Sequence, residues 1–390
     1  MSIKEIDKSY VANTYGRFDL EIARGCGSLV YDTDGKEYID LSSGIAVNTF
    51  GMCDPVLINA ITEQLNKCQH TSNLYYSEPC ARLAKLLCEK TGAKKVFFGN
   101  SGAEANECAI KVARLWGSLN KGEKYYNIIT LKNSFHGRTL TTLSATGQDV
   151  FHKYFNPLTE GFLYAEANNA DSVERLLLEN KCCAIMMELV QGEGGVMALD
   201  KDFVKAVSLL CEKYNILLLI DEVQTGNGRT GTLYAYEQYD ITPDVVTTAK
   251  GLGGGLPIGA CLMFGKTENI LGAGLHGSTF GGNPVACAGA ISVLERINEE
   301  LLTQVKAKSK YIFDELTGAD GIKSVSGKGL MIGIETEADA ALVIAKCMEK
   351  GLLPIKAKNK VRLLPPLNIP FDLIEKAVLI IKETAKECLQ

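Results

Sequence analysis

Between residues 54 and 264 the hydrophobic positions alternate repeatedly between helical and strand-like patterns. Apolar residues recur at helical spacing in five segments: 54–68, 79–90, 103–116, 171–180 and 201–213. Short apolar runs without alternation lie between and after them: 96–98, 127–131, 184–187, 216–220, 245–249 and 260–264. Strands that are apolar on both faces are typical of a mostly parallel sheet covered by helices. The pattern therefore predicts an α/β fold with a sheet of six strands.

The two ends of the chain follow other patterns. Residues 1–20 are mixed and polar, and they predict an arm. Residues 31–41 alternate around Asp34-Gly35, which predicts a β-hairpin. After residue 284 the pattern predicts an interrupted helix, a hairpin, a helix, a strand and a final helix: to about 318, 322–335, 337–349, 361–364 and 371–388.

The change of pattern predicts three parts of the chain. We expect an N-terminal arm with part of a small domain, a large domain and a C-terminal small domain: 1–50, 51–284 and 285–390. The small domain mixes helices with a hairpin, so we expect it to be α+β.

Composition excludes several classes of protein. The net charge of −5 gives no support to a general nucleic-acid role. The chain contains no run of about 18 apolar residues, so we expect no membrane span, and the start has no apolar signal segment. The 13 cysteines include no C-x-x-C pair, which disfavours a zinc ribbon, and we expect no metal site. Together these features predict a cytoplasmic protein.

Lys250 carries the most informative chemistry of the sequence. It lies between the β-branched run 245–249 and a glycine-rich turn, 251–257. A lone lysine at a strand end is usually a solvated terminus. Burial between these two segments would instead lower the pKa of its amine and free the amine to attack a carbonyl carbon. This is the behaviour of a Schiff-base lysine.

Asp221 follows the apolar run 216–220, which predicts that it ends a buried strand. Ligands of parallel α/β sheets bind outside the carboxyl ends of the strands. Taken alone, such an aspartate is more simply a helix cap or half of an ion pair. One helix-sized connection, however, could bring Lys250 to the same rim of the sheet. A carboxylate there would keep a pyridine nitrogen protonated.

Two further turns predict ligand contacts. Ser101 and Gly102 lie between a strand and a helix, where a cap, free N–H groups and the helix dipole attract an anion. The sequence has neither a Walker A motif nor G-x-G-x-x-G, which disfavours a nucleoside triphosphate or a dinucleotide. In the second turn, Phe135 could stack on a flat cofactor and Arg138 could bind a carboxylate. The intervening His136 could be a base, although a structural role is the simpler interpretation.

Six ordered motifs make the chain resemble the class III pyridoxal-phosphate aminotransferases, of fold type I. The motifs are Asn100-Ser101-Gly102-Ala103-Glu104-Ala105, Ser134-Phe135-His136-Gly137-Arg138-Thr139, Gln191-Gly192-Glu193-Gly194-Gly195, Asp221-Glu222-Val223-Gln224-Thr225-Gly226, Lys250-Gly251 and Ser278-Thr279-Phe280-Gly281-Gly282-Asn283-Pro284. The resemblance spans most of the chain, from Tyr31 to Arg362. It implies a large domain with a mostly parallel sheet, a smaller α+β domain and pyridoxal 5'-phosphate as cofactor.

The resemblance implies a role for each residue of the cofactor site. Lys250 would bind the cofactor through its amine and then move the proton during transamination. Asp221 would pair with the ring nitrogen, Gln224 would hydrogen-bond the phenolic oxygen, and Phe135 would stack on the ring.

The resemblance also implies a shared phosphate site. Ser101, Gly102 and Ala103 would bind the phosphate of the cofactor within one chain. Thr279 would reach the phosphate of the neighbouring subunit's cofactor, so we expect a homodimer with active sites at the subunit interface.

For the substrate, the resemblance implies contacts from Ser278, Arg138, Glu193 and Arg362. Arg138 would bind the distant carboxylate of the amino donor. Arg362 would bind the carboxylate beside the reacting carbon of 2-oxoglutarate. Glu193 would mask Arg362 until 2-oxoglutarate arrives. A plain salt bridge is the alternative, and the glycines on both sides of Glu193 favour the switch.

The implied reaction is transamination between N-acetylornithine and 2-oxoglutarate, which gives N-acetylglutamate 5-semialdehyde and glutamate in arginine biosynthesis. Segment 42–48 is typical of the members with this activity. Ornithine, succinylornithine, 4-aminobutyrate and diaminopimelate-type donors remain alternatives. An aminomutase would not need Arg362 as a second carboxylate clamp, and a non-catalytic binding protein would not need Lys250.

Overall fold

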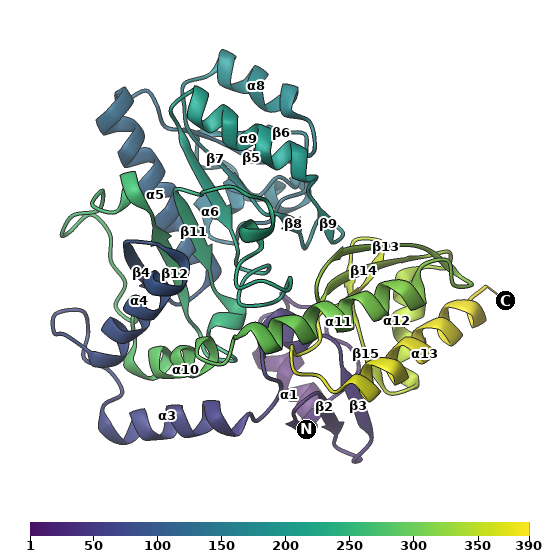
Figure 1. The fold of residues 1–390 in the computed structure, drawn as a ribbon. Helices are drawn as coiled ribbons and strands as arrows, with labels where there is room; N and C mark the ends of the chain where they lie inside the picture. Colours follow the sequence, from purple (N-terminus) through teal and green to yellow (C-terminus); the bar gives the residue numbers. More distant parts are fainter. Residues whose placement is uncertain (390) are drawn as a thin grey trace.

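A seven-stranded sheet forms the centre of the computed structural model, which describes residues 1–389 (Figure 1). The strand order is β4-β12-β11-β10-β7-β5-β6. The bounds along this order are Lys95–Gly99, Gly259–Met263, Val245–Thr248, Leu217–Asp221, Cys182–Met187, Asn127–Leu131 and Phe162–Ala165. The neighbouring strands from β11 to β6 pair in parallel, whereas β12 is antiparallel to both β11 and β4. The prediction of an α/β fold with a mostly parallel sheet is therefore confirmed.

Helices cover both faces of this sheet (Figure 1). The five predicted helical segments correspond to α3 Pro55–Lys67, α4 Glu78–Thr91, α5 Gly102–Lys121, α8 Ala170–Glu179 and α9 Lys201–Lys213, whereas the short helices α6 Leu140–Ala145 and α7 Asp149–His152 were not predicted. α5 packs against β12, β11 and β7, and most of its inward residues are fully buried. It is longer than predicted and brings its N-terminus to the carboxyl end of β4.

Two details of the sheet differ from the prediction. The short strand β6 was not predicted, although its four residues, Phe162-Leu163-Tyr164-Ala165, form a short apolar run. The connection between β10 and β11 contains no α-helix, only the 3-10 turn Ala235–Gln238, so the expected helix-sized connection was wrong. The two strands are nevertheless direct neighbours, with Asp221 opposite Thr247. The rim shared by Asp221 and Lys250 therefore forms without a crossover helix.

The C-terminal part contains a second sheet, of order β13-β14-β17-β16. The bounds are β13 Ile322–Lys328, β14 Met331–Thr336, β16 Ile355–Ala357 and β17 Lys360–Leu363, with helices α10 Pro284–Leu294, α11 Glu299–Leu316, α12 Ala340–Glu349 and α13 Phe371–Glu387. The predicted hairpin, strand and helices of this region are therefore confirmed.

The N-terminal segment forms a third sheet, of order β1-β2-β3-β15. Its strands are β1 Ile22–Cys26, β2 Leu29–Asp32, β3 Glu37–Asp40 and β15 Leu352–Leu353, and the helix α1 Ile3–Tyr10 precedes them without a buried residue. The parallel pairing of β15 with β3 joins the N-terminal hairpin to the C-terminal part. The exact domain boundaries stay a prediction.

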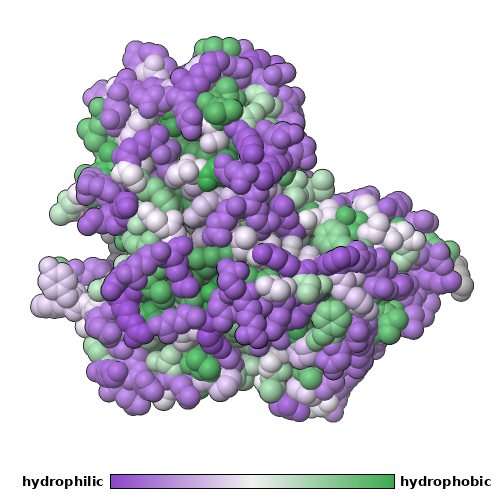
Figure 2. Space-filling view, in the orientation of Figure 1, coloured by the Kyte–Doolittle hydropathy of each residue, from purple (hydrophilic) through white to green (hydrophobic). Residues whose placement is uncertain are grey.

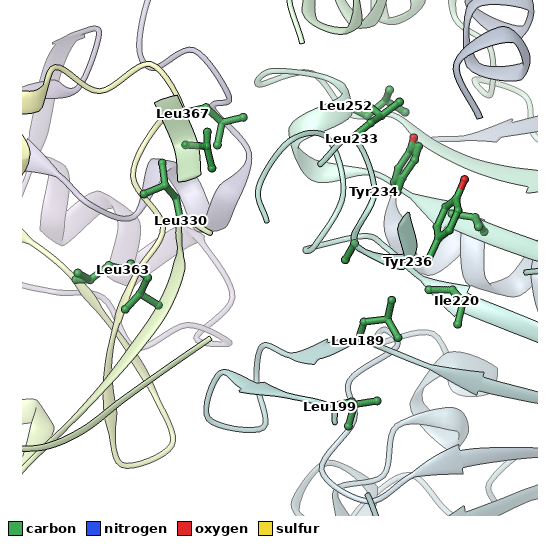
Figure 3. Close-up of a cluster of buried hydrophobic side chains, with 14 of the residues drawn as sticks. Leu189, Leu199, Ile220, Leu233, Tyr234, Tyr236, Leu252, Leu330, Leu363 and Leu367 are labelled. Carbon is green, nitrogen blue, oxygen red and sulfur yellow. The ribbon is translucent and has the colours of Figure 1, made fainter. Parts of the chain in front are cut away.

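One large hydrophobic core crosses from the seven-stranded sheet into the C-terminal part (Figure 3). Leu330, Leu363 and Leu367 lie on one side of this cluster, and Leu233 and Tyr234 lie on the other. The surface in Figure 2 is mostly hydrophilic, with hydrophobic residues scattered over it. No helix among the described residues is long and apolar enough to cross a membrane. The shared core fixes β17 relative to the rim of the main sheet.

A small β8–β9 pair, Val190–Gln191 with Met197–Ala198, follows β7. It carries the glycine-rich turn that contains Glu193. Because this turn faces β17, it places Glu193 beside Arg362.

Candidate active site

A cavity of about 470 Å³ opens at the carboxyl ends of the central strands. Most of the site residues predicted from the sequence line it together: Ser101, Gly102, Ala103, Phe135, Arg138, Asp221, Gln224 and Lys250. They come from the N-terminus of α5 and from the segments that follow β5, β10 and β11. The residues that the sequence placed at one rim of the sheet therefore line a single cavity.

Asp221 is almost fully buried at the end of β10 and is surrounded by donors. Its Oδ2 accepts hydrogen bonds from Asn106 Nδ2 and His136 Nδ1, both at 2.8 Å. Its Oδ1 accepts one from the backbone N–H of Val223 at 3.0 Å. These contacts hold the Asp221 carboxylate in one orientation at the floor of the cavity.

His136 and Asn106 both hold the Asp221 carboxylate by hydrogen bonds. Burial opposes the charge of His136, but the hydrogen bond and charge of Asp221 outweigh it, so the pKa of His136 is raised. The structural interpretation of His136 therefore agrees with the geometry, since its Nδ1 is already engaged. Sequence reasoning missed Asn106. The available signal was a polar residue one helical turn after Gly102, on the buried face of a helix.

Lys250 follows β11 with a strained backbone. Its φ of +42° lies in the left-handed region, which is uncommon for a residue with a side chain. The carbonyls on either side are held, because Asn227 Nδ2 donates to Ala249 O at 3.2 Å and Thr49 Oγ1 donates to Gly251 O at 2.7 Å. Burial lowers the pKa of the Lys250 amine, and the charge of Glu193 opposes this only in part. The amine is thus poised to act as a nucleophile and proton carrier.

The N-terminus of α5 offers a site for an anion. Ser101 caps the helix, and its Oγ accepts from Glu104 N at 3.2 Å. The N–H groups of Gly102 and Ala103 lie in the first turn, where a helix has no internal acceptors for them. Gly102 must be a glycine, because a Cβ there would lie 2.6 Å from Val223 Cγ1. These donors and the dipole of a 20-residue helix favour a bound phosphate.

Arg362 on β17 reaches the same region from the C-terminal part. Its Nη1 donates to Glu193 Oε1 at 2.6 Å and to Gln224 Oε1 at 3.2 Å. The Arg362 side chain is 3% exposed and that of Glu193 is 31% exposed. Burial raises the pKa of Glu193, but the charge and hydrogen bond of Arg362 outweigh it and lower that pKa overall. Glu193 therefore stays ionised and covers a buried guanidinium.

The turn that carries Glu193 leaves no room for side chains on either neighbour. A Cβ at Gly192 would lie 2.5 Å from Gln224 Oε1, and one at Gly194 would lie 2.8 Å from Asn133 O. The turn therefore fits closely between the main sheet and β17, while the Glu193 side chain itself stays partly exposed.

Glu188, which directly follows β7, was missed by the sequence reasoning. It lines the cavity and accepts from Phe135 N at 2.7 Å and from Gly192 N at 3.4 Å. Burial raises the pKa of Glu188 to about 7, although the charge of His136 opposes this. The rule that singled out Asp221, a carboxylate at the carboxyl end of a buried strand, could also have found Glu188.

Arg138 lies at the rim of the cavity with its side chain exposed. Its guanidinium lies 4.2 Å from the ring centre of Phe151 and 5.4 Å from that of Phe135. No carboxylate among residues 1–389 forms an ion pair with it. It is therefore free to bind a carboxylate of a ligand.

Ser278 and Thr279 are not part of this cavity in the single chain. They line a second hollow of about 650 Å³, together with Tyr75 and Tyr76. Asn100 Nδ2 donates to Ser278 Oγ at 3.1 Å, which connects this hollow to the start of α5. Thr279 is exposed. One chain alone thus does not bring Thr279 to Lys250.

Comparisons with known proteins agree with this geometry. A sequence model of the family described as Aminotransferase class-III matches residues 10–385. The acetylornithine aminotransferase of Haemophilus ducreyi is 49% identical over 387 residues, which cover 99% of this chain and 98% of the relative. The crystal structure of acetylornithine aminotransferase from Elizabethkingia anophelis is 34% identical, with a TM-score of 0.90 and 98% coverage of both chains. The ornithine aminotransferase of Toxoplasma gondii is 30% identical, with a TM-score of 0.94, covering 99% of this chain and 94% of that structure.

Glu222, beside Asp221 in sequence, faces away from the cavity into the core. It is fully buried and accepts hydrogen bonds from Thr225 Oγ1 at 2.5 Å and from Tyr236 N at 2.8 Å. Burial raises the pKa of Glu222 to about 7, and these hydrogen bonds oppose the shift only in part. The folded state therefore binds a proton that the unfolded state has already released above about pH 4.5.

This raised pKa predicts how the stability of a Glu222→Gln variant depends on pH. Stability of the wild type should fall as pH rises between about 5 and 7, by up to about 1.4 kcal/mol per pH unit from this group. The variant lacks this loss, so its free energy of unfolding relative to the wild type should rise by about 2 kcal/mol from pH 5.5 to pH 7.

Urea unfolding at pH 5.5, 6.3, 7 and 8 measures the difference between the two proteins. Glu300→Gln, at an exposed position, serves as the control and should give a nearly constant difference from the wild type. A constant difference for Glu222→Gln as well would contradict the assignment of a raised pKa to Glu222.

Proposed function

The chain belongs to the class III aminotransferases, and on this premise we propose that it transfers the amino group of N-acetylornithine to 2-oxoglutarate. The products are N-acetylglutamate 5-semialdehyde and glutamate. Relatives named acetylornithine aminotransferase, 49% and 44% identical over nearly the whole chain, support this reaction. The observation that carries the proposal is the placement of Lys250 and Asp221 in one cavity, with a masked Arg362 hydrogen-bonded to Gln224 of the cavity lining.

The cavity fits pyridoxal 5'-phosphate, the cofactor of this family. A flat ring would lie against Phe135, its nitrogen would face the held carboxylate of Asp221, and its phosphate would bind the free N–H groups of Gly102 and Ala103 with Ser101. When bound, the cofactor supplies an aldehyde that accepts the amino group and a ring that withdraws electrons from the reacting carbon.

Three side chains of the protein would transfer the proton and contact the cofactor ring. Lys250 Nζ, whose pKa is lowered by burial, acts as the nucleophile and carries the proton between the two carbons that exchange it. Asp221 stays an acceptor because Asn106 and His136 donate to it, and it would therefore hold a proton on the ring nitrogen of the bound cofactor. The oxygen of the Gln224 amide accepts from Arg362, so its NH₂ group would be the donor to the phenolic oxygen of the bound ring.

The two substrates require two carboxylate sites. N-Acetylornithine presents its terminal amine, so its carboxylate is distant and would reach the exposed Arg138 at the rim. Ser278 would assist from the second hollow, which the homodimer proposed below would bring to the cavity. 2-Oxoglutarate presents a carboxylate beside the reacting carbon, where Arg362 can bind it as a fork. Glu193 covers Arg362 in the first half-reaction and must leave it in the second.

We propose that the active unit is a homodimer with shared sites. Thr279 would bind the phosphate of the partner's cofactor, which agrees with its exposure in a hollow separate from Lys250. Tyr75 and Tyr76 line the same hollow and are more than 70% exposed, as expected for a surface that another protein covers. We also place the enzyme in the cytoplasm, because all thirteen of its cysteines are free.

A panel of amino donors tests the substrate. With 2-oxoglutarate as acceptor, kcat/KM should be at least about tenfold higher for N-acetylornithine than for ornithine, succinylornithine or 4-aminobutyrate, a difference of about 1.4 kcal/mol in transition-state binding. Ornithine is the strongest rival, given the similarity to ornithine aminotransferase structures. Equal values across the panel would reject the specific donor.

Lys250→Ala is the control for this panel. It should show no transamination. Borohydride reduction and digestion of the wild type should place a phosphopyridoxyl group on the Lys250 peptide, and the variant should have none. An adduct at another lysine would reject the assigned site while leaving the family assignment intact.

Removal of the Glu193 carboxylate should relax donor selection. In Glu193→Ala and Glu193→Gln, Arg362 is unmasked from the start, so glutamate should compete as donor about five- to tenfold better, as expected for an ion pair worth about 1 kcal/mol. The measurement is kcat/KM for glutamate relative to N-acetylornithine. Glu166→Ala, which removes an exposed partner of Lys132, is the matched control. An unchanged donor preference in both Glu193 variants would show that the pair is only structural.

Mixed dimers test whether the sites are shared. Thr279→Ala and Lys250→Ala each damage both sites of their own dimer. In a hybrid of the two chains, one site combines an intact Lys250 with an intact Thr279. The hybrid should therefore regain about half of the wild-type activity and one tight cofactor site per dimer, measured by absorbance titration. Recovery that never exceeds the mean of the two parent dimers would contradict the shared site.

A further inference from the structure

Arg229 is a buried cation that no part of the proposed mechanism uses. It is 3% exposed and lies in the loop between β10 and β11. Its Nη1 donates to two backbone carbonyls, Leu330 O at 3.1 Å and Pro365 O at 2.5 Å. Burial alone lowers its pKa, to about 9, and no carboxylate among residues 1–389 pairs with it. A charge buried without a counter-ion is costly, which indicates that these two contacts have a specific task.

Pro365 belongs to the segment that directly follows Arg362. The two prolines of this segment, Pro365 and Pro366, have no N–H donors, so they cannot extend the β17 ladder. The carbonyl of Leu367 accepts from Lys308 Nζ at 3.0 Å, and Lys308 is a second buried cation without a carboxylate partner in the described chain. Burial lowers the pKa of Lys308 to about 8. Cationic side chains therefore replace the strand partners that this segment lacks.

The other contacts of the segment come from the N-terminal part. Leu364 N donates to Leu41 O at 2.7 Å, and Ser43 Oγ donates to Leu364 O at 2.5 Å. Leu367 N donates to Thr49 O at 2.9 Å, and the Thr49 hydroxyl contacts the residue after Lys250. The segment after Arg362 is thus connected to the backbone of Lys250.

The loop that contains Arg229 also contacts the surroundings of both Arg362 and Lys250. Two residues earlier in this loop, Asn227 donates to Ala249 O, beside Lys250. Gln224, at its start, accepts from Arg362. The backbone of Arg229 itself packs closely against the β13–β14 turn. Leu330 N donates to Arg229 O at 2.9 Å, and a Cβ at Gly329 would lie 2.5 Å from that oxygen. Figure 3 shows Leu330, Leu363 and Leu367 together at this junction.

We propose that Arg229 is a positioning residue for the second carboxylate clamp of the enzyme. Its guanidinium fixes the carbonyl of Pro365 and thereby holds Arg362 in register with Gln224 and Lys250. The proposal rests on the proposed function, because it assigns Arg362 to the keto acid. It identifies 2-oxoglutarate binding, rather than donor binding, as the step that depends on Arg229.

The effect should differ between the two half-reactions. N-Acetylornithine uses Arg138, which lies on another loop and does not contact the Arg229 network, so its KM should stay within about twofold of the wild-type value. 2-Oxoglutarate needs Arg362 at its place, so its KM should rise at least about tenfold. Both hydrogen bonds come from one nitrogen, Nη1. A lysine should not replace Arg229, because its shorter side chain does not carry the ammonium group to the position of Nη1.

Steady-state kinetics of Arg229→Lys and Arg229→Met in the full-length holoenzyme test this split. The half-reaction with the donor alone, followed by the absorbance of the cofactor, should keep its wild-type rate. Arg114→Lys is the matched control, because Arg114 also donates to a backbone carbonyl, that of Glu160, but lies on α5 away from Arg362. It should change neither KM. An equal rise of both KM values in the Arg229 variants, or no rise at all, would overturn the proposal.

A second variant covers the case in which the Arg229 variants do not fold. Lys308→Met removes the cation at the far end of the same segment and should raise the KM for 2-oxoglutarate selectively, by about three- to fivefold. A uniform loss of activity in this variant would overturn the proposal. These kinetics use as amino donor the amine with the highest kcat/KM in the wild type. If N-acetylornithine is not that amine, the proposed function fails, but the comparison of the two KM values, for the donor and for 2-oxoglutarate, still tests the role of Arg229.

Discussion

A carboxylate buried at the end of a strand must be surrounded by hydrogen-bond donors, and the site is organised around this requirement at Asp221. One donor, Asn106, comes from α5, a second, His136, comes from the segment after β5, and a third, the Val223 N–H, comes from the turn after β10. Each of these elements also carries a residue that lines the cavity. Satisfying one charge therefore places the N-terminus of α5, the ring of Phe135 and the loop of Gln224 relative to one another.

The sequence predicted the elements whose pattern depends on local burial. The period of α5 and the apolar runs of β10 and β11 were sufficient to place Asp221 and Lys250 on one rim. The antiparallel direction of β12 was not predictable, because a buried strand has the same composition in either direction. Asn106 and Glu188 left weak local signals, but their partners lie far away in the chain, and those partners are what define their roles. Arg229 was missed because its partners are distant backbone carbonyls, which no local pattern records.

The two arginines of the proposed substrate site differ in a way that matches their tasks. Arg138 is exposed and packs on Phe151, so it can accept a carboxylate at any time. Arg362 is buried, and its charge is balanced by a partly exposed Glu193 on a closely fitted glycine turn. A buried guanidinium without that partner would be destabilising, whereas an exposed one would bind every amino acid that entered. The Glu193 carboxylate both balances the buried charge of Arg362 and keeps Arg362 from binding other amino acids.

The position of β12 has a consequence for biosynthesis of the chain. β4 lies at the sheet edge and hydrogen-bonds only to β12, which is encoded more than 150 residues later. The turn between β4 and α5 therefore has no stable support until β12 has left the ribosome, and β17 emerges later still. During this time the apolar strand β4 of the nascent chain has no strand to pair with. Such unpaired strands bind chaperones and promote aggregation.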